Sequence, residues 1–144
     1  MEKKIFVSNF TQDPGPRYIR QDIDGAMTSG EAFYFNVLNK EFKECYEEKK
    51  MLILCLDGVS GYPSSFLDEA IGELVYDFRL DNVKQLLDFE TRMHKKRVNQ
   101  VKEETYIQWE KRRTQNEKVN HSPNINKEIF YLSLSGRIEI KTLP

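Results

Sequence analysis

Hydrophobic and polar residues follow two different periods along the chain, and these periods predict strands and helices. The run 51–56 is apolar without polar alternation, which is typical of a central strand buried on both faces. Apolar residues in 66–78 recur at intervals of three and four, which predicts an amphipathic helix. The segment 57–65 contains two glycines and a proline and predicts the loop between them.

Weaker patterns predict the elements before this central unit. Residues 3–10 predict a first strand, and 18–23 predict a short second strand after a turn-rich loop. Thr28 precedes Glu31 by three residues, which is the spacing of a capping box. We therefore expect a helix over about 28–48.

The C-terminal third differs from the rest in its charge. Residues 82–90 predict another strand. Residues 90–118 contain nine Lys or Arg against five Glu, a local charge of +4, and a thin apolar stripe that includes Trp109. We expect a long, partly exposed helix there. In residues 128–144, apolar and polar residues alternate on both sides of a Ser-Gly pair, which predicts a hairpin or a bent strand.

The order of these elements defines the expected fold class. Strands alternate with helices, which favours an α/β sandwich with a mostly parallel or mixed sheet. A length of 144 residues suits one domain with a sizeable core.

Composition and charge exclude several classes of protein. The formal net charge is −1, and no apolar run approaches the ~20 residues that span a bilayer. We expect a cytoplasmic protein with no membrane contact. Cys45 and Cys55 are interpreted as free, buried thiols. Because His94 and His121 fit no zinc spacing with them, we expect no metal and no cofactor.

Two adjacent serines, Ser64 and Ser65, lie at the start of the predicted helix 66–78. One interpretation is that they only cap this helix by binding a free backbone N–H group. A second is that one of them accepts a phosphate, which a helix N-terminus accommodates. A third is that the loop is an unmodified docking site for another protein.

Three further residues near this loop have two interpretations each. Asp57 follows the strand and either orders the loop or contributes to function at the strand end. Tyr62 is either a lid on the core or an anchor in an interface. Arg17 is either a surface residue of a turn or a contact for a phosphate or acidic partner.

The segment "LDGVSGYPSSFLDEAIGELV", together with "GPRY" and "SGEAF" upstream, resembles the bacterial STAS-like family of unknown function. That family is related to the STAS domains of anti-sigma factor antagonists and sulfate transporters. The resemblance covers about residues 5–90. It implies a STAS-like core over 1–90, with a mixed sheet of four to five strands and helices mainly on one face. We expect residues 91–144 to complete or extend the same domain.

The resemblance also implies a mechanism. In STAS antagonists, a partner ATPase of the histidine-kinase-like fold phosphorylates a serine at the start of a helix, and this modification releases the partner. Ser64 matches that serine by position, and Ser65 is its neighbour. Pro63 departs from the antagonist pattern, which usually has an acidic residue there.

These observations predict a non-enzymatic regulatory protein, because no catalytic motif is present. We expect it to bind a histidine-kinase-like ATPase, or a complex containing one, through segment 58–65. The predicted partner-binding residues are Asp57, Gly58, Gly61, Tyr62, Pro63, Phe66, Asp68 and Arg17.

The alternative is a nucleic-acid-binding accessory protein, for example in a phage-defence or mobile-element system, that uses the basic helix 92–113. Its predicted contacts are Lys95, Lys96, Arg97, Lys111, Arg112 and Arg113. Tyr106 and Trp109 lie between these basic groups, and an exposed Trp109 would favour a contact with a protein. An exposed edge strand would also allow a homodimer.

Overall fold

The computed structural model describes residues 1–144, and the side chains of all of them apart from Asp24. The strands are β1 (Glu2–Phe6), β2 (Met51–Cys55), β3 (Leu87–Glu90), β4 (Lys127–Leu132) and β5 (Ile138–Leu143). The helices are α1 (Val7–Phe10), α2 (Gly30–Phe33), α3 (Asn39–Glu48), α4 (Ser64–Phe78), α5 (Leu80–Leu86), α6 (Lys95–Gln100) and α7 (Tyr106–Thr114). The chain is therefore an α/β protein, as the alternation of patterns predicts.

The central sheet is parallel, with the strand order β1-β2-β3. The register pairs Phe6 with Cys55 and Cys55 with Glu90. β4 and β5 form a separate antiparallel pair. This arrangement differs from the expected single sheet of four to five strands, because the C-terminal strands pair only with each other.

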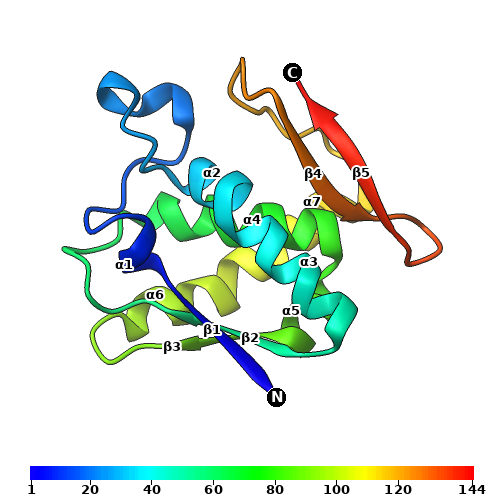
Figure 1. The fold of residues 1–144 in the computed structure, drawn as a ribbon, viewed down its shortest axis with the longest axis horizontal. Coiled ribbons are helices and arrows are strands. Elements are labelled where there is room, and N and C mark those ends of the chain that lie inside the picture. The colour runs from blue at the N-terminus through cyan, green and yellow to red at the C-terminus, as the bar shows by residue number, and fades with distance from the viewer.

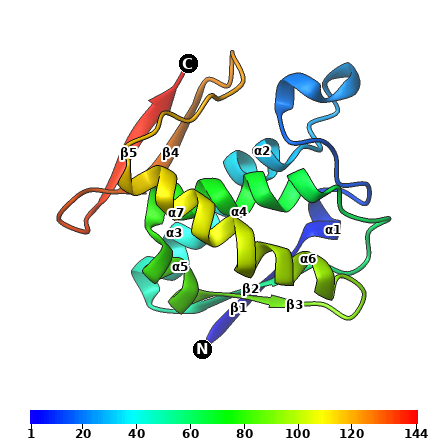
Figure 2. The same ribbon diagram turned by 180° about the vertical axis from the view of Figure 1, so that it is seen from behind.

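The helices cover one face of the parallel sheet, as Figures 1 and 2 show. Leu52 and Leu54 of β2 point into the core and are fully buried, whereas Lys4 and Phe6 of β1 are exposed. The hairpin of β4 and β5 lies on the opposite side of the helices from the sheet (Figure 1). The core therefore lies between the sheet and the helices and continues between the helices and the hairpin.

The N-terminal strand is shorter than the prediction. β1 ends at Phe6, and the next four residues form the short helix α1. The predicted strand at 18–23 is wrong, because Ile19–Gln21 and Ile23–Gly25 form 3₁₀ turns. The N–H groups of Gln21, Asp22 and Ala26 donate within the turns, whereas those of Ile19 and Arg20 donate to the side chains of Glu31 and Ser122, so no ladder forms.

The predicted helix over 28–48 is confirmed in its extent but not in its cap. It begins as α2, passes through a π-helical turn at Tyr34–Leu38 and continues as α3. Ser29 is the N-cap, and its Oγ accepts a hydrogen bond from the backbone N–H of Ala32 at 3.0 Å. The expected capping box of Thr28 and Glu31 is wrong, because the Glu31 side chain is buried and bonds elsewhere.

The strand over 51–56 and the helix over 66–78 are both present, as β2 and α4. The predicted strand over 82–90 is wrong in its first half, because α5 occupies that half. Of this segment, only the second half, β3, is a strand, and it pairs with β2. Arg79 separates α4 from α5 with a φ of 74°. This left-handed residue turns the chain so that α5 can lead into the sheet.

The charged segment forms α6, a π-helical turn at Val101–Thr105, and α7 in direct succession. The helical part begins at Lys95, later than predicted, because Thr91, Arg92 and Met93 form a loop that donates hydrogen bonds to Asp57. Trp109 is 1% exposed, so it lies on the buried stripe of this segment and is not available for the contact with a protein that an exposed Trp109 would favour. Its indole packs directly over Gly72 of α4, where a Cβ atom would overlap the ring. A small residue on α4 thus creates the site that buries the tryptophan.

The C-terminal residues form the predicted hairpin. The backbone N–H of Gly136 donates to the carbonyl of Ser133 at 2.9 Å and closes its turn. Ile129, Leu132 and Leu143 extend the hydrophobic core from the hairpin side. Both cysteines are free and buried, as expected.

Candidate functional site

The segment 57–65 lies at the carboxyl end of β2, where parallel sheets often place functional loops. The loop 91–94 after β3 lies at the same edge, and α1 follows the end of β1 there. Gly58 has a φ of 91°, which favours glycine, and approaches the Ser8 side chain of α1. Three connections therefore meet at one edge of the sheet (Figure 1).

Asp57 connects the two loops at this edge. Its carboxylate accepts hydrogen bonds from the Thr91 hydroxyl at 2.6 Å, the Arg92 N–H at 2.7 Å and the Met93 N–H at 3.2 Å. The bond from Thr91 is the main reason why the pKa of Asp57 is lowered. The sequence suggests that Asp57 orders its own loop, but the structure shows that it orders the loop after the neighbouring strand.

Ser64 and Ser65 are the first two residues of α4, and Ser64 is exposed. Pro63 is the N-cap, and no described side chain caps the helix. The interpretation that the serines only cap α4 is therefore wrong. Ser64 is exposed and forms no side-chain hydrogen bond with a described residue, and it lies at the N-terminus of a helix of 15 residues, where backbone N–H groups lack helical partners.

Tyr62 is a lid on the core, because its side chain is 5% exposed. Its hydroxyl donates to the Leu56 carbonyl at 2.7 Å. The ring packs against Phe66 and, edge-on, against His94 at 4.8 Å between ring centroids. Tyr62 thus holds the loop 57–65 against the loop after β3.

The acidic partner of Arg17 lies within the chain. Its guanidinium donates to Asp68 at 2.7 Å and to Glu69 at 3.2 Å. Asp68 also accepts from the Thr105 hydroxyl at 2.8 Å and from the Trp109 indole at 3.4 Å. These contacts attach the N-terminal loop and the last helices to α4.

The predicted partner-binding residues therefore divide into two groups. Phe66 is in the core, and Tyr62, Arg17 and Asp68 make internal contacts. Gly58 and Pro63 are exposed, and Asp57 and Gly61 are half-buried. The two candidate phospho-acceptors lie beside them, with Ser64 exposed and Ser65 half-buried. The second group alone presents a surface to another molecule.

The two basic clusters lie at opposite ends of the helical segment from α6 to α7. Lys95 and Lys96 are exposed, whereas Arg97 is half-buried and bonds to Gln100 at 3.0 Å. Lys111 and Arg112 are exposed, and Arg113 pairs with Glu110 at 2.7 Å. Because Tyr106 and Trp109 are buried, neither ring is available to stack on a base.

The structure also reveals a buried group of acids that the sequence interpretation did not identify. Glu31 of α2 and Glu69 and Glu73 of α4 are each at most 2% exposed. One carboxylate oxygen from each lies within 4.8 Å of the others. The only signal in the sequence is that Glu69, Glu73 and Asp77 repeat every four residues beside the apolar stripe.

Residues from distant parts of the chain provide hydrogen-bond partners for some of these carboxylate oxygens but not for all of them. Glu31 accepts from the Ser122 hydroxyl at 2.5 Å, and Glu73 lies 2.7 Å from the His121 ring nitrogen. One oxygen of Glu69 and one of Glu73 are buried without a partner among the described residues. Burial raises the pKa of Glu69 to about 10 and that of Glu73 to about 8.

Neighbouring cationic side chains and raised pKa values both reduce the negative charge of this acid group. Carboxylate oxygens suit hard cations, but Arg17 and His121 already occupy positions beside Glu69 and Glu73. The raised pKa values of Glu69 and Glu73 favour their protonated forms, which reduces the remaining negative charge. We therefore assign the group a structural role.

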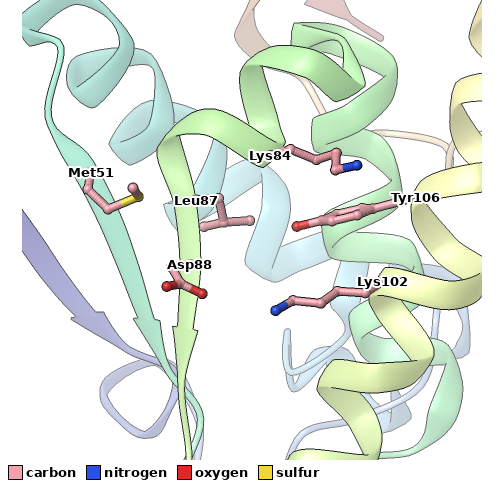
Figure 3. A pocket seen from close by; sticks show the side chains of 6 residues that line it. All are labelled: Met51, Lys84, Leu87, Asp88, Lys102 and Tyr106. Carbon is pink, nitrogen blue, oxygen red and sulfur yellow. The ribbon is translucent and has the colours of Figure 1, made fainter.

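A pocket of about 410 Å³ lies near the amino ends of β2 and β3. Its lining residues are Met51, Lys84, Leu87, Asp88, Lys102 and Tyr106 (Figure 3). None of them belongs to the site predicted from the sequence. A second pocket, also of about 410 Å³, lies between Tyr62 and the start of α6, beside the loop 57–65.

The fold and the exposed loop define an α/β protein with an accessible surface at the carboxyl ends of its parallel strands. Residues 29–91 match the model of a family described as a STAS-like domain of unknown function. The resemblance inferred from the loop and α4 is thus confirmed over this segment. Neither the curated proteins nor the solved structures give a match. Among the described residues, no helix is long and apolar enough to cross a membrane.

Proposed function

We propose that the protein is a non-enzymatic regulator that binds a protein partner through its segment 58–65. The observation that supports this proposal is the exposed Ser64 at the first position of α4, in a helix start that no described side chain caps. A capping role would require its hydroxyl to bond to the helix. An exposed hydroxyl at this position instead remains accessible to another protein.

The proposed partner is an ATPase of the histidine-kinase-like fold, or a complex that contains one. This part of the proposal depends on the resemblance of the loop and α4 to STAS-like domains, which the family match over 29–91 supports.

Phosphorylation of Ser64 is the proposed switch. A phosphate there would lie beside the free N–H groups at the positive end of the helix dipole. It would also add close to two negative charges to the docking surface. Asp68, the nearest acid along α4, is paired with Arg17, so its charge is already partly compensated.

The test compares Ser64→Ala and Ser64→Asp with the native chain in pull-downs from the source cells, followed by titration of the purified partner. Ser135→Asp is the matched control, because Ser135 is an exposed serine in the distant hairpin turn. We expect Ser64→Asp to weaken binding at least tenfold, and Ser135→Asp to leave it unchanged. Equal affinity for all variants, with an intact fold, would refute the role of Ser64.

The switch itself is tested by incubating the native chain with that partner and ATP. Mass spectrometry should locate a phosphate on Ser64, and the Ser64→Ala variant should lack it. A phosphate on another residue, or none, would contradict the switch while leaving the docking proposal open to the binding experiment.

One observation favours the alternative function in nucleic-acid binding. Lys95, Lys96, Lys111 and Arg112 are all exposed on one helical segment. Contacts to phosphates would make the affinity for DNA or RNA fall steeply with salt. Binding of a short duplex that is absent, or that does not depend on salt, would exclude this alternative.

A further inference from the structure

The pocket in Figure 3 lies at the end of the parallel sheet opposite to segment 58–65. Leu87 begins β3 and Met51 begins β2, whereas segment 58–65 follows the carboxyl end of β2. Lys102 and Tyr106 reach the pocket from the π-helical turn and α7, and Lys84 reaches it from α5. Three separate parts of the chain therefore form this pocket, and none of them takes part in the proposed docking surface.

The Tyr106 hydroxyl is the first feature that points to a ligand. The side chain is only 5% exposed, and its hydroxyl points into the pocket (Figure 3). No described residue forms a hydrogen bond with it. The other buried tyrosines differ, because Tyr34 bonds to Asp77 at 2.5 Å and Tyr62 bonds to the Leu56 carbonyl at 2.7 Å. The Tyr106 hydroxyl is not among the buried polar atoms that lack a partner, because it opens onto the pocket, where it is free to donate to a ligand.

Two lysines supply the second, independent feature. Lys84 and Lys102 flank the Tyr106 ring in Figure 3. Neither forms an ion pair with a described side chain. Among the described residues, Asp88 is the one acid that lines the pocket, and its charge acts on Tyr106, but the two lysines leave the lining with a net positive charge. Unpaired ammonium groups beside an unused hydroxyl donor favour an anion.

Leu87 and Met51 determine what else the ligand must contain. Leu87 is 4% exposed and Met51 is half-buried, and both line the pocket with apolar atoms. A fully hydrated inorganic ion would gain nothing from these side chains. An anion with an apolar body would bury that body against them.

We propose that this pocket binds a small organic anion, a carboxylate or a phosphate monoester with an apolar body. Its oxygens accept a hydrogen bond from the Tyr106 hydroxyl and interact with Lys84 and Lys102. Its apolar body lies against Leu87 and Met51. The proposal is independent of the docking function of segment 58–65.

The experiment titrates the full chain, labelled with ¹⁵N, with benzoate and with phenyl phosphate, and uses benzyl alcohol as the neutral probe. We expect the amide signals of residues that line the pocket to shift with either anion. The stronger probe identifies whether the site prefers a carboxylate or a phosphate. Equal binding of benzyl alcohol, or shifts that avoid the pocket, would overturn the proposal.

Variants assign the binding to the named side chains. The double change of Lys84→Gln with Lys102→Gln should weaken binding of the stronger anion about tenfold, and Tyr106→Phe about fivefold. The matched control is Lys95→Gln with Lys96→Gln, which removes the same charge at another exposed site and should leave affinity within about twofold. An equal loss in the control would attribute binding to net charge and refute the site. Circular dichroism melts confirm that each variant is folded. If Tyr106→Phe does not fold, the lysine double variant decides the result. Both lysines are exposed, so their replacement should not disturb the fold.

Discussion

Two adjacent sides of α4 are both buried, but one carries apolar side chains and the other carries acidic side chains. The side toward the sheet is apolar and includes Leu74 and Phe78, which are fully buried. The adjacent side carries Glu69, Glu73 and Asp77, which are at most 6% exposed. The apolar side is stabilised by contacts that do not depend on pH. The acidic side requires protons and specific partners, because an unpaired buried charge is costly.

The cationic and imidazole partners of the acidic side come from outside the segment 29–91 that matches the family. Arg17, His121 and Lys141 contact Glu69, Glu73 and Asp77 respectively. The ends of the chain are thus attached to the central helix by polar contacts. One helix thus joins an apolar core and a polar one, and the two should respond differently to mutation and to pH.

The largest expected effect is on the apolar side. Phe78→Ala removes a ring that packs edge-on against Phe42 at 5.0 Å between centroids. We expect the free energy of unfolding to fall by about 3–5 kcal/mol. Urea denaturation at pH 5 and pH 8 measures it, and the loss should be equal at both. A loss that changes with pH would contradict the proposed contrast.

The acidic side should make stability depend on pH. The raised pKa values of Glu69 and Glu73 mean that the folded chain keeps protons that the unfolded chain releases above ~pH 4.3. This contribution is fully present below that pH and is lost as pH rises toward 8 and beyond. The free energy of unfolding should fall by about 1.4 kcal/mol per pH unit for each such proton.

The double variant Glu69→Gln with Glu73→Gln should have a flatter profile in urea denaturation from pH 5 to pH 8. Glu128→Gln is the control, because Glu128 is exposed in β4 and should keep the native slope. An unchanged slope in the double variant would show that these two acids are not the source.

A smaller effect is expected from the hydroxyl that contacts Asp77. Tyr34→Phe removes the donor to Asp77 and the acceptor for Asn39, which lies 2.9 Å away. Both buried groups would lose a bond, which costs about 1–3 kcal/mol. Thermal and urea denaturation measure the loss. Native stability in this variant would mean that the neighbouring Lys141 compensates for it.

The smallest effect is expected at the exposed start of α4. Ser64→Ala should change the free energy of unfolding by no more than about 0.5 kcal/mol, because its side chain has no cap bond to lose. A loss near 1 kcal/mol would restore the capping interpretation. This measurement separates a functional serine from a structural one without a partner.

Local patterns predicted the central unit well. The unbroken apolar run of β2 and the helical period of α4 each depend on neighbouring residues, and the loop between them was placed correctly. The exposed position of Ser64 could also be inferred from its place before the apolar stripe. The pocket beside Tyr106 could not, because its lining comes from three separate parts of the chain.

The sequence alone determined which segments are apolar on one side and where glycine and proline interrupt them, and therefore β2, the loop 57–65 and α4. Only the tertiary structure decided that Trp109 is buried over Gly72, that Arg17 pairs with Asp68 and that Glu73 lies in the interior. The physical reason is the range of the interactions. A periodic pattern reports the environment of one element, whereas these contacts join residues 37 or more positions apart, which only packing brings together.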